Sequence, residues 1–179
     1  YYSFCKYNIL SPPVFTGLDN FKNMIADGTF LQTIKVTFFF AFVSVPLKLI
    51  FALLVAMLLL KNTKMSGIYR AAYYLPSIIG GSVAVAILWK RMFAMDGVVN
   101  KLLGSIGIKT SISWLGDTKT AIWILILLAV WQFGSSMVMF LAALKNVPAD
   151  LYEAAEIDGA SKVKMFFSIT VPQLSLIHI

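Results

Sequence analysis

The sequence holds few of the residues from which catalytic and metal sites are built. It has one cysteine, Cys5, and one histidine, His178, so an internal disulfide and a cysteine-based zinc motif are both excluded. Charged residues make up only 13% of the chain, about half of the usual share in soluble domains. We therefore expect no catalytic residue, no metal site and no cofactor in this chain.

Acidic residues are absent from the three longest apolar runs, at 36–60, 71–89 and 121–144, and the only charge in them is Lys48. The chain is 59% apolar, which is more than so short a soluble chain can bury. Each run is long enough to cross a bilayer, which takes about 20 residues, and lipid leaves helices as the way to satisfy the backbone. The sequence predicts an all-α, polytopic membrane protein with spans at about 30–60, 71–92 and 120–144.

Basic residues outnumber acidic ones and give a net charge of +7, but they are scattered between the runs. Scattered charge argues against nucleic acid as a partner and is typical of loops that lie beside membrane lipid. Counting the basic residues on the two sides does not decide which loops face the cytoplasm.

Pro46 and Lys48 interrupt the first run. Proline kinks a membrane helix and frees a carbonyl group, and a lysine at that depth costs about 3 kcal/mol on the insertion scale. Lys48 is therefore expected to face protein or a wet cavity. Two interpretations stay open: a structural pair with a helix outside this chain, or a place on a substrate pathway.

The second run contains Pro76 and the pair Gly80–Gly81. Small residues let membrane helices pack closely, whereas proline with glycine also permits unwinding beside a transport pathway. In the third run, the polar patch at 132–136 either bonds helices together or lines a wall that contacts sugar. On the pathway interpretation, depth and chemistry select Lys48, Ser77, Gly81, Trp131, Gln132 and Ser135.

The segments outside the runs are rich in turn residues. Residues 1–29 are expected to form an exposed loop leading to a short helix at 20–26, capped by Asp19 or Asn20. Residues 90–120 are expected to form two turns around a short amphipathic helix. The apolar face of that helix would hold Val98, Leu102, Leu103 and Ile106.

The loop at 145–172 is the longest polar segment after the third run. Pro148 ends the preceding helix, and Asp150 with Glu153 is close to a capping box that starts a new one. Gly159 supplies a turn because it adopts positive φ freely. Two alanines on one helical face would let a partner approach closely; that face holds Leu151, Ala154, Ala155 and Asp158. A second short helix would carry a stripe of Val163, Phe166 and Phe167.

Two other interpretations of the 145–172 loop are open. One is an amphipathic helix that lies on the membrane surface. The other is a DNA-reading helix-turn-helix, which the acidic first helix and the membrane tether disfavour.

The pattern Glu153-Ala154-Ala155, three residues, Gly159, nine residues, Ile169, two residues, Pro172 resembles the cytoplasmic coupling motif of ABC importer permeases. Val171 stands where leucine is usual. Over about residues 8–174 the chain is also similar to the carbohydrate-uptake branch, in particular to the first permease of the maltose type. The segments that carry this similarity are 17–21, 70–76, 89–90, 97–100 and 114–117.

The resemblance implies the type I importer permease fold. The chain would hold the second to fourth of six core spans, with the first and the last spans outside it. The resemblance also implies that 1–29 and 90–120 lie outside the cell, and that 61–70 and 145–168 lie in the cytoplasm. The residues that would couple to an ATPase are Glu153, Ala154, Ala155, Asp158 and Gly159.

The implied partners are a second, unlike permease subunit, two cytoplasmic ATPase subunits, an extracellular or periplasmic solute-binding protein and a sugar, at the bacterial inner membrane. The chain has no Gly-x-x-x-x-Gly-Lys-Ser/Thr loop, so the partners would hydrolyse ATP and this chain would not be an enzyme. The alternatives are an ABC permease for a non-sugar solute, an ion-coupled transporter, a membrane-bound enzyme and a scaffold. Ion coupling needs an acid or similar group within the spans, and none of the three runs has one.

Overall fold

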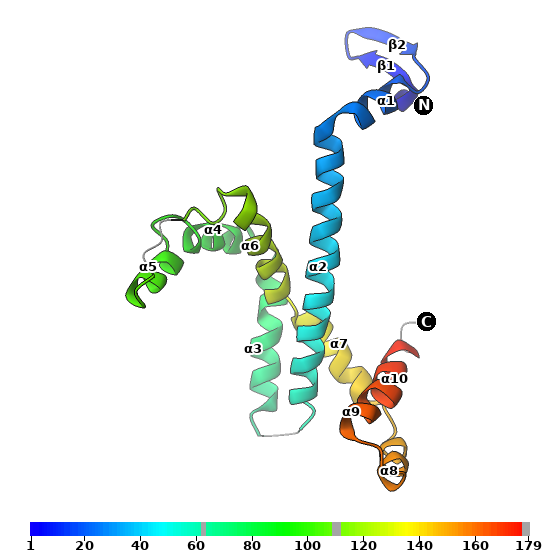
Figure 1. Cartoon of the computed structure of the whole chain (residues 1–179), viewed down its shortest axis with the longest axis vertical. Coiled ribbons are helices and arrows are strands. Elements are labelled where there is room, and N and C mark those ends of the chain that lie inside the picture. Colours follow the sequence, from blue (N-terminus) through cyan, green and yellow to red (C-terminus); the bar gives the residue numbers. More distant parts are fainter. Residues whose placement is uncertain (62–63, 109–111, 177–179) are drawn as a thin grey trace. The chain divides into compact units, whose positions relative to one another are not determined.

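The computed structural model describes residues 1–61, 64–108 and 112–176, which are helical apart from one β-hairpin (Figure 1). The predicted all-α class is confirmed. Contacts divide the chain into two units, Tyr1–Phe42 and Val43–Ile179, and each is considered by itself. His178, for which no role is predicted, lies outside the described residues.

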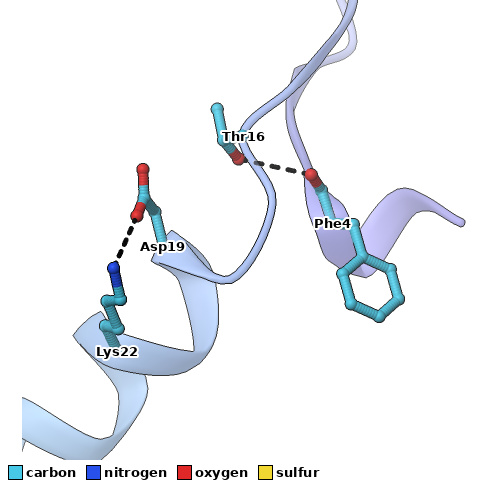
Figure 2. Close-up of polar contacts among 4 residues, drawn as sticks. All are labelled: Phe4, Thr16, Asp19 and Lys22. Atoms are coloured by element: carbon cyan, nitrogen blue, oxygen red, sulfur yellow. Dashed lines mark hydrogen bonds and ion pairs between the residues drawn. The ribbon is translucent and has the colours of Figure 1, made fainter.

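The N-terminal unit contains a hairpin where the sequence predicted an exposed loop. Strand β1 (Cys5–Asn8) pairs antiparallel with β2 (Ser11–Phe15) after a short 3₁₀ turn, η1 (Tyr2–Phe4). Two prolines in β2 concealed the strand, although an edge strand tolerates proline. The hydroxyl of Thr16 donates to the carbonyl oxygen of Phe4 at 3.4 Å (Figure 2).

Helix α1 (Asp19–Ala26) confirms the short helix, but neither predicted residue caps it. Asp19 lies in the first turn, 3.6 Å from the ammonium of Lys22 (Figure 2). The Asn20 amide donates at 2.9 Å to the carbonyl oxygens of Ser3 and Cys5. Asn20 therefore ties the helix to the hairpin instead of starting the helix.

Helix α2 (Gly28–Leu58) is continuous through Pro46 and is the one described helix that is long and apolar enough to cross a membrane by itself. The Asp27 carboxylate accepts a hydrogen bond from the N–H of Thr29 at 3.0 Å. This bond holds the pKa of Asp27 below its ordinary value. The hydrogen bond therefore stabilises the start of α2 fully when the pH is above the ordinary aspartate pKa. This stabilisation is lost as the pH falls through the lowered pKa of Asp27.

The predicted span at 71–92 is not one straight helix. It consists of α3 (Ser66–Ile79) and α4 (Val83–Met92), which are bent by 97° at residues 80–82 (Figure 1). Two glycines with low helix propensity sit at the bend. Ser82 then starts the new helix, because its hydroxyl accepts from the N–H of Val85 at 3.3 Å.

The predicted span at 120–144 is also divided, into α6 (Thr118–Trp131) and α7 (Gly134–Lys145), with a bend of 43°. The bend falls at Gln132 and Phe133, within the polar patch. Each bent pair is apolar and long enough to serve as one broken span.

The segment between α4 and α6 contains the predicted amphipathic helix, α5 (Val98–Ser105). The buried amide of Asn100 organises this segment. It donates to the carbonyl oxygens of Ala94, Met95 and Ile112 at 3.3, 2.9 and 2.9 Å, and accepts from the Trp114 indole at 2.9 Å.

The core of the second unit joins α2 to α7 and to α10 (Val171–Leu176). Ala52, Ala56 and Met137 have no measurable exposure. Between α7 and α10 lie α8 (Ala149–Ile157), α9 (Lys162–Met165) and a π-helical turn, η2 (Phe166–Thr170). Side chains of α2 and α7 meet in this core, whereas the close helix crossing of α7 is with α3.

We expect Asn100→Asp to open the segment around α5, because a carboxylate cannot donate to the three carbonyl groups. The loss should be about 3 kcal/mol of local stability. Hydrogen exchange of residues 93–108 in the full-length protein measures it. Asn146→Asp is the control, since the exposed Asn146 side chain has no bond in the described structure. Unchanged exchange in Asn100→Asp would contradict the assignment.

Candidate functional site

Ser77 bridges the break between α6 and α7. Its hydroxyl donates to the carbonyl oxygen of Gln132 at 3.2 Å and accepts from the N–H of Ser135 at 3.0 Å. Gln132 is the residue that ends α6, and Ser135 lies in the first turn of α7. Both backbone groups belong to the kind that a helix end leaves unsatisfied. One side chain of α3 therefore caps two helix ends.

Gly134 brings the start of α7 onto the backbone of α3. A Cβ at this position would collide with the carbonyl oxygen of Tyr73 and would lie 2.7 Å from the Cα of Tyr74. Real Cβ atoms do not approach backbone so closely, and the obstructing atoms cannot rotate away. Only glycine fits at this crossing.

Gln132 connects the two breaks. Its side chain occupies the space in which Gly80 would carry a Cβ, and its amide donates to the carbonyl oxygen of Leu128 at 3.3 Å. The turn at 80–82 and the break at 132–133 are thus in contact. We call these two segments, with Ser77 and Gly134, the double break.

Phe133 anchors the double break in the core. It is 5% exposed, and its ring centroid lies 4.9 Å from that of Phe51 in α2 and 5.9 Å from that of Tyr73 in α3. On the α4 side, the rings of Trp131 and Trp89 lie 5.7 Å apart. Aromatic contacts therefore flank the double break on both sides.

The six predicted pathway residues are only partly brought together. Ser77, Gln132 and Ser135 meet through the bridge, and Trp131 adjoins it. Gly81 lies in the exposed turn, where a Cβ would meet no atom within 4 Å. Lys48 is half-buried in α2, and its amino group bonds to none of the described residues.

Close packing was one of the two interpretations predicted for Gly80–Gly81, and Gly80 packs against the Gln132 side chain. The close approach of Gly134 to α3 and the burial of Phe133 at the break were not predicted. A glycine within the polar patch was the available signal for Gly134. Nothing in the sequence indicated that Gln132 would cover Gly80, because the two are far apart along the chain.

The 145–172 loop starts differently from the prediction. Helix α8 begins at Ala149 after Pro148, and no side chain caps it. The predicted capping box with Asp150 is therefore wrong. Pro148 holds the extended backbone that precedes the helix, which places Asp150 inside the first turn, where a negative charge stabilises the helix dipole.

The turn at Gly159 is confirmed, with φ of +74°. The N–H of Ala160 donates to the carbonyl oxygen of Ala155 at 2.9 Å, and the N–H of Gly159 donates to that of Glu156 at 3.0 Å. This pair of bonds is the Schellman motif, which satisfies the last carbonyl groups of a helix. The turn is therefore closed by backbone hydrogen bonds and strongly favours glycine.

The predicted face of α8 is divided. Leu151, Ala154 and Asp158 are exposed, as is Glu153, whereas Ala155 is half-buried. Ile157, for which no role is predicted, is 87% exposed. The exposed side of α8 thus presents small and apolar groups beside acidic ones.

Tyr152 fixes the other side of α8. Its hydroxyl forms a 2.8 Å hydrogen bond with that of the buried Thr170 in η2. Ser161 caps α9 by accepting from the N–H of Lys164 at 3.3 Å. The predicted apolar stripe is largely exposed, at 68% for Val163 and 65% for Phe167. In the described part of the chain, no three His, Cys, Asp or Glu side chains converge as metal ligands.

Comparisons with known proteins show which proteins this chain is similar to. The family model described as "Binding-protein-dependent transport system inner membrane component" matches residues 24–179. A probable ABC transporter permease protein of Bacillus subtilis (strain 168), YesP, is 52% identical over 97% of this chain and 56% of its own length. The lactose transport system permease protein LacF of Rhizobium radiobacter is 38% identical over 89% of this chain and 54% of its own length.

A solved structure extends the likeness to the fold. It is a bacterial alginate ABC transporter in complex with an alginate pentasaccharide-bound periplasmic protein. It has a TM-score of 0.75 and 25% identity, over 89% of this chain and 56% of the matched one. The present chain thus spans little more than half of the length of these relatives.

Replacing Ser77 by alanine should leave a carbonyl and an N–H group unsatisfied at the double break. We expect a loss of about 1–3 kcal/mol in the free energy of unfolding, measured by denaturant titration of the full-length protein in detergent. Ser136→Ala is the matched control. Ser136 lies beside Ser135 in the first turn of α7, and its side chain has no bond in the described structure. Equal stability of the two variants would show that the bridge is not significant.

Proposed function

This chain belongs to the family of binding-protein-dependent transport system inner membrane components, and we propose that it is part of a permease subunit that imports sugars or oligosaccharides with energy from ATP. The observation that carries the proposal is the hydrogen-bonded α8–Gly159 turn, which presents an exposed face of small and acidic residues. The names of relatives, such as the lactose permease LacF, support a saccharide. A permease of the same class for a non-sugar solute is the second candidate.

In this proposal α2 and the two bent pairs, α3–α4 and α6–α7, each cross the membrane once. Residues 1–29 and 90–120 lie outside the cell, and 61–70 and the 145–172 loop lie in the cytoplasm. The first span and the last spans belong to parts of the protein outside this chain. The chain resides in the bacterial inner membrane as a multi-pass protein in contact with lipid.

The proposed partners are a second permease subunit, which is an unlike chain of the same family, two cytoplasmic ATPase subunits and a solute-binding protein. The periplasmic protein in the alginate transporter complex supports the binding protein. No role for nucleic acid is proposed, and ATP hydrolysis is assigned to the ATPase subunits, so this chain is a transport subunit and not an enzyme.

Coupling would begin at α8. The exposed Glu153, Ala154, Ile157 and Asp158 fit a docking face for an ATPase subunit, and Gly159 with the half-buried Ala155 holds that face in place. Because α8 follows α7 after a short turn at Pro148, a pull on α8 acts on α7.

The double break is the joint to which this motion would be passed. Gly134 and Ser77 hold the start of α7 on α3, so α3 and α7 would move together. The bends at 80–82 and 132–133 then separate this moving pair from α4 and α6. Such hinged motion of packed helices is a known form of access switching.

The substrate pathway residues are proposed in two groups. The hydroxyl of Ser77 and the N–H of Ser135 are engaged with each other, so their part is to shape the pathway wall. Trp131 and Gln132, beside the exposed Gly81, would contact the solute from the double break. Lys48 would contact it from α2.

Uptake into proteoliposomes tests the function as a whole. The full-length permease, its partner permease, the ATPase subunits and the binding protein are reconstituted with labelled oligosaccharides. We expect uptake that requires ATP and the binding protein and is unchanged by an ionophore. Uptake that collapses with the ionophore at constant ATP would favour an ion-coupled transporter instead.

We expect Gly159→Val to abolish ATP-driven uptake while the protein stays in the membrane, because a β-branched residue cannot hold φ of +74° without strain. Gly159→Asn should retain part of the uptake, since asparagine tolerates this region. Gly67→Ala, at a helical glycine whose Cβ would meet no atom within 4 Å, is the control. Normal uptake by Gly159→Val would refute the coupling role.

Ile157→Asp should weaken binding of the ATPase subunits, because it removes the most exposed apolar side chain of α8. Taking one apolar side chain out of an interface lowers the affinity about tenfold. The effect is measured by the amount of ATPase subunit that co-purifies with the detergent-solubilised permease at a series of ATPase concentrations. Val163→Asp, on the exposed stripe beyond the Gly159 turn, is the comparison and should weaken binding less. Unchanged binding by Ile157→Asp would place the docking face elsewhere.

A further inference from the structure

The face of α2 on which Lys48 lies is turned toward protein. Ser44, one turn earlier, is 4% exposed, and Ala52, one turn later, is fully buried. The opposite side of the helix is exposed and apolar, with Ile50 at 56% and Leu54 at 50%. Since residues four apart share a helical face, the amino group of Lys48 starts from the inward stripe and not from the lipid side.

The depth of Lys48 prevents it from reaching water along the helix. It lies ten residues before the end of α2 at Leu58, which is about 15 Å at the α-helical rise. A bilayer core is about 30 Å thick. If α2 crosses the membrane, the charge is therefore near the midplane.

No described group neutralises this charge. The Lys48 amino group has no ion pair or hydrogen bond with any described residue, and segments 28–58, 66–92 and 118–145 contain no aspartate or glutamate. Every charged side chain in these segments is basic: Lys35, Lys48, Arg70, Lys90, Arg91, Lys119 and Lys145. The spans therefore set up a positive field that favours an anion.

We propose that Lys48 binds a carboxylate of the substrate, so that the solute is an acidic, uronate-bearing oligosaccharide. This inference rests on the proposed function as a saccharide importer and adds the class of saccharide. A lysine near the middle of a membrane span needs an anionic partner or water. A carboxylate of a solute that passes along the pathway would pair with Lys48 for a short time and then leave. A permanent ion pair within the protein would instead leave Lys48 unable to bind the solute.

The test compares acids with neutral forms of the same skeleton. The reconstituted full-length transporter is given labelled trigalacturonate, trimannuronate and triguluronate, each with its fully methyl-esterified form, and maltotriose. We expect at least one acid to be taken up about tenfold faster than its ester, as expected when a charged hydrogen bond is removed. Lys48→Met should remove this preference and Lys48→Arg should keep it.

Lys35→Met is the matched control, because Lys35 is an exposed lysine nearer to the start of the same helix. It should leave the preference for the acid unchanged. Uptake of maltotriose or the esters but of no acid would overturn the inference and leave the importer function intact. Equal loss of acidic and neutral uptake in Lys48→Met would overturn it too and assign Lys48 to a structural ion pair. No ATP-driven uptake of any saccharide would overturn the proposed function itself.

Discussion

The structure depends on a constraint that lipid imposes on the backbone: a helix that breaks in an apolar environment must find partners for the groups it frees. Ser77 meets this constraint for the α6–α7 break with a single hydroxyl, which accepts from Ser135 and donates to Gln132. Because Ser77 belongs to α3, satisfying the break also fixes which helix α7 crosses. Gly134 then sets how closely the two helices approach. The bridge thus uses backbone groups of the polar patch, and of the patch's side chains Gln132 bonds within the protein.

The two ends of α7 have contrasting properties. At its start, α7 is held against the backbone of α3, and at its end it leads through Pro148 into the exposed α8. Along its length it packs in the core beside Ala52 and Ala56 of α2. On the proposed coupling role, a helix held in this way would transmit displacement, because close-packed interiors deform little. The 145–172 loop is similarly fixed, by the Schellman turn at Gly159 and by the Tyr152–Thr170 hydrogen bond.

The sequence was sufficient for the fold class, the short helices at 19–26 and 98–105, and the turn at Gly159, because each depends on local composition or on one residue with special backbone freedom. It was insufficient for the contacts of the double break, since Gly80 meets Gln132 only through tertiary packing. The hairpin was missed because its two prolines are typical of a loop. The caps predicted at Asp19 or Asn20 and at Asp150 were wrong because neighbouring residues, Leu18 and Pro148, took those positions. The pathway and coupling roles stay predictions.

The contact made by Gly134 has a consequence for how this protein can change over time. The two nearest atoms that a Cβ would strike belong to the main chain of Tyr73 and Tyr74, ahead of the Ser77 hydroxyl, and main-chain atoms are the same whatever amino acids occupy those positions. No exchange of side chain at 73 or 74 can make room for a larger residue at 134. The contact between Gly134 and the main chain of α3 therefore leaves no pattern of compensating substitutions between the two positions. It nevertheless fixes how closely α7 approaches α3. Once Gly134 is replaced, the packing of α7 on α3 is restored only by reversion to glycine or by a shift of the whole of α7.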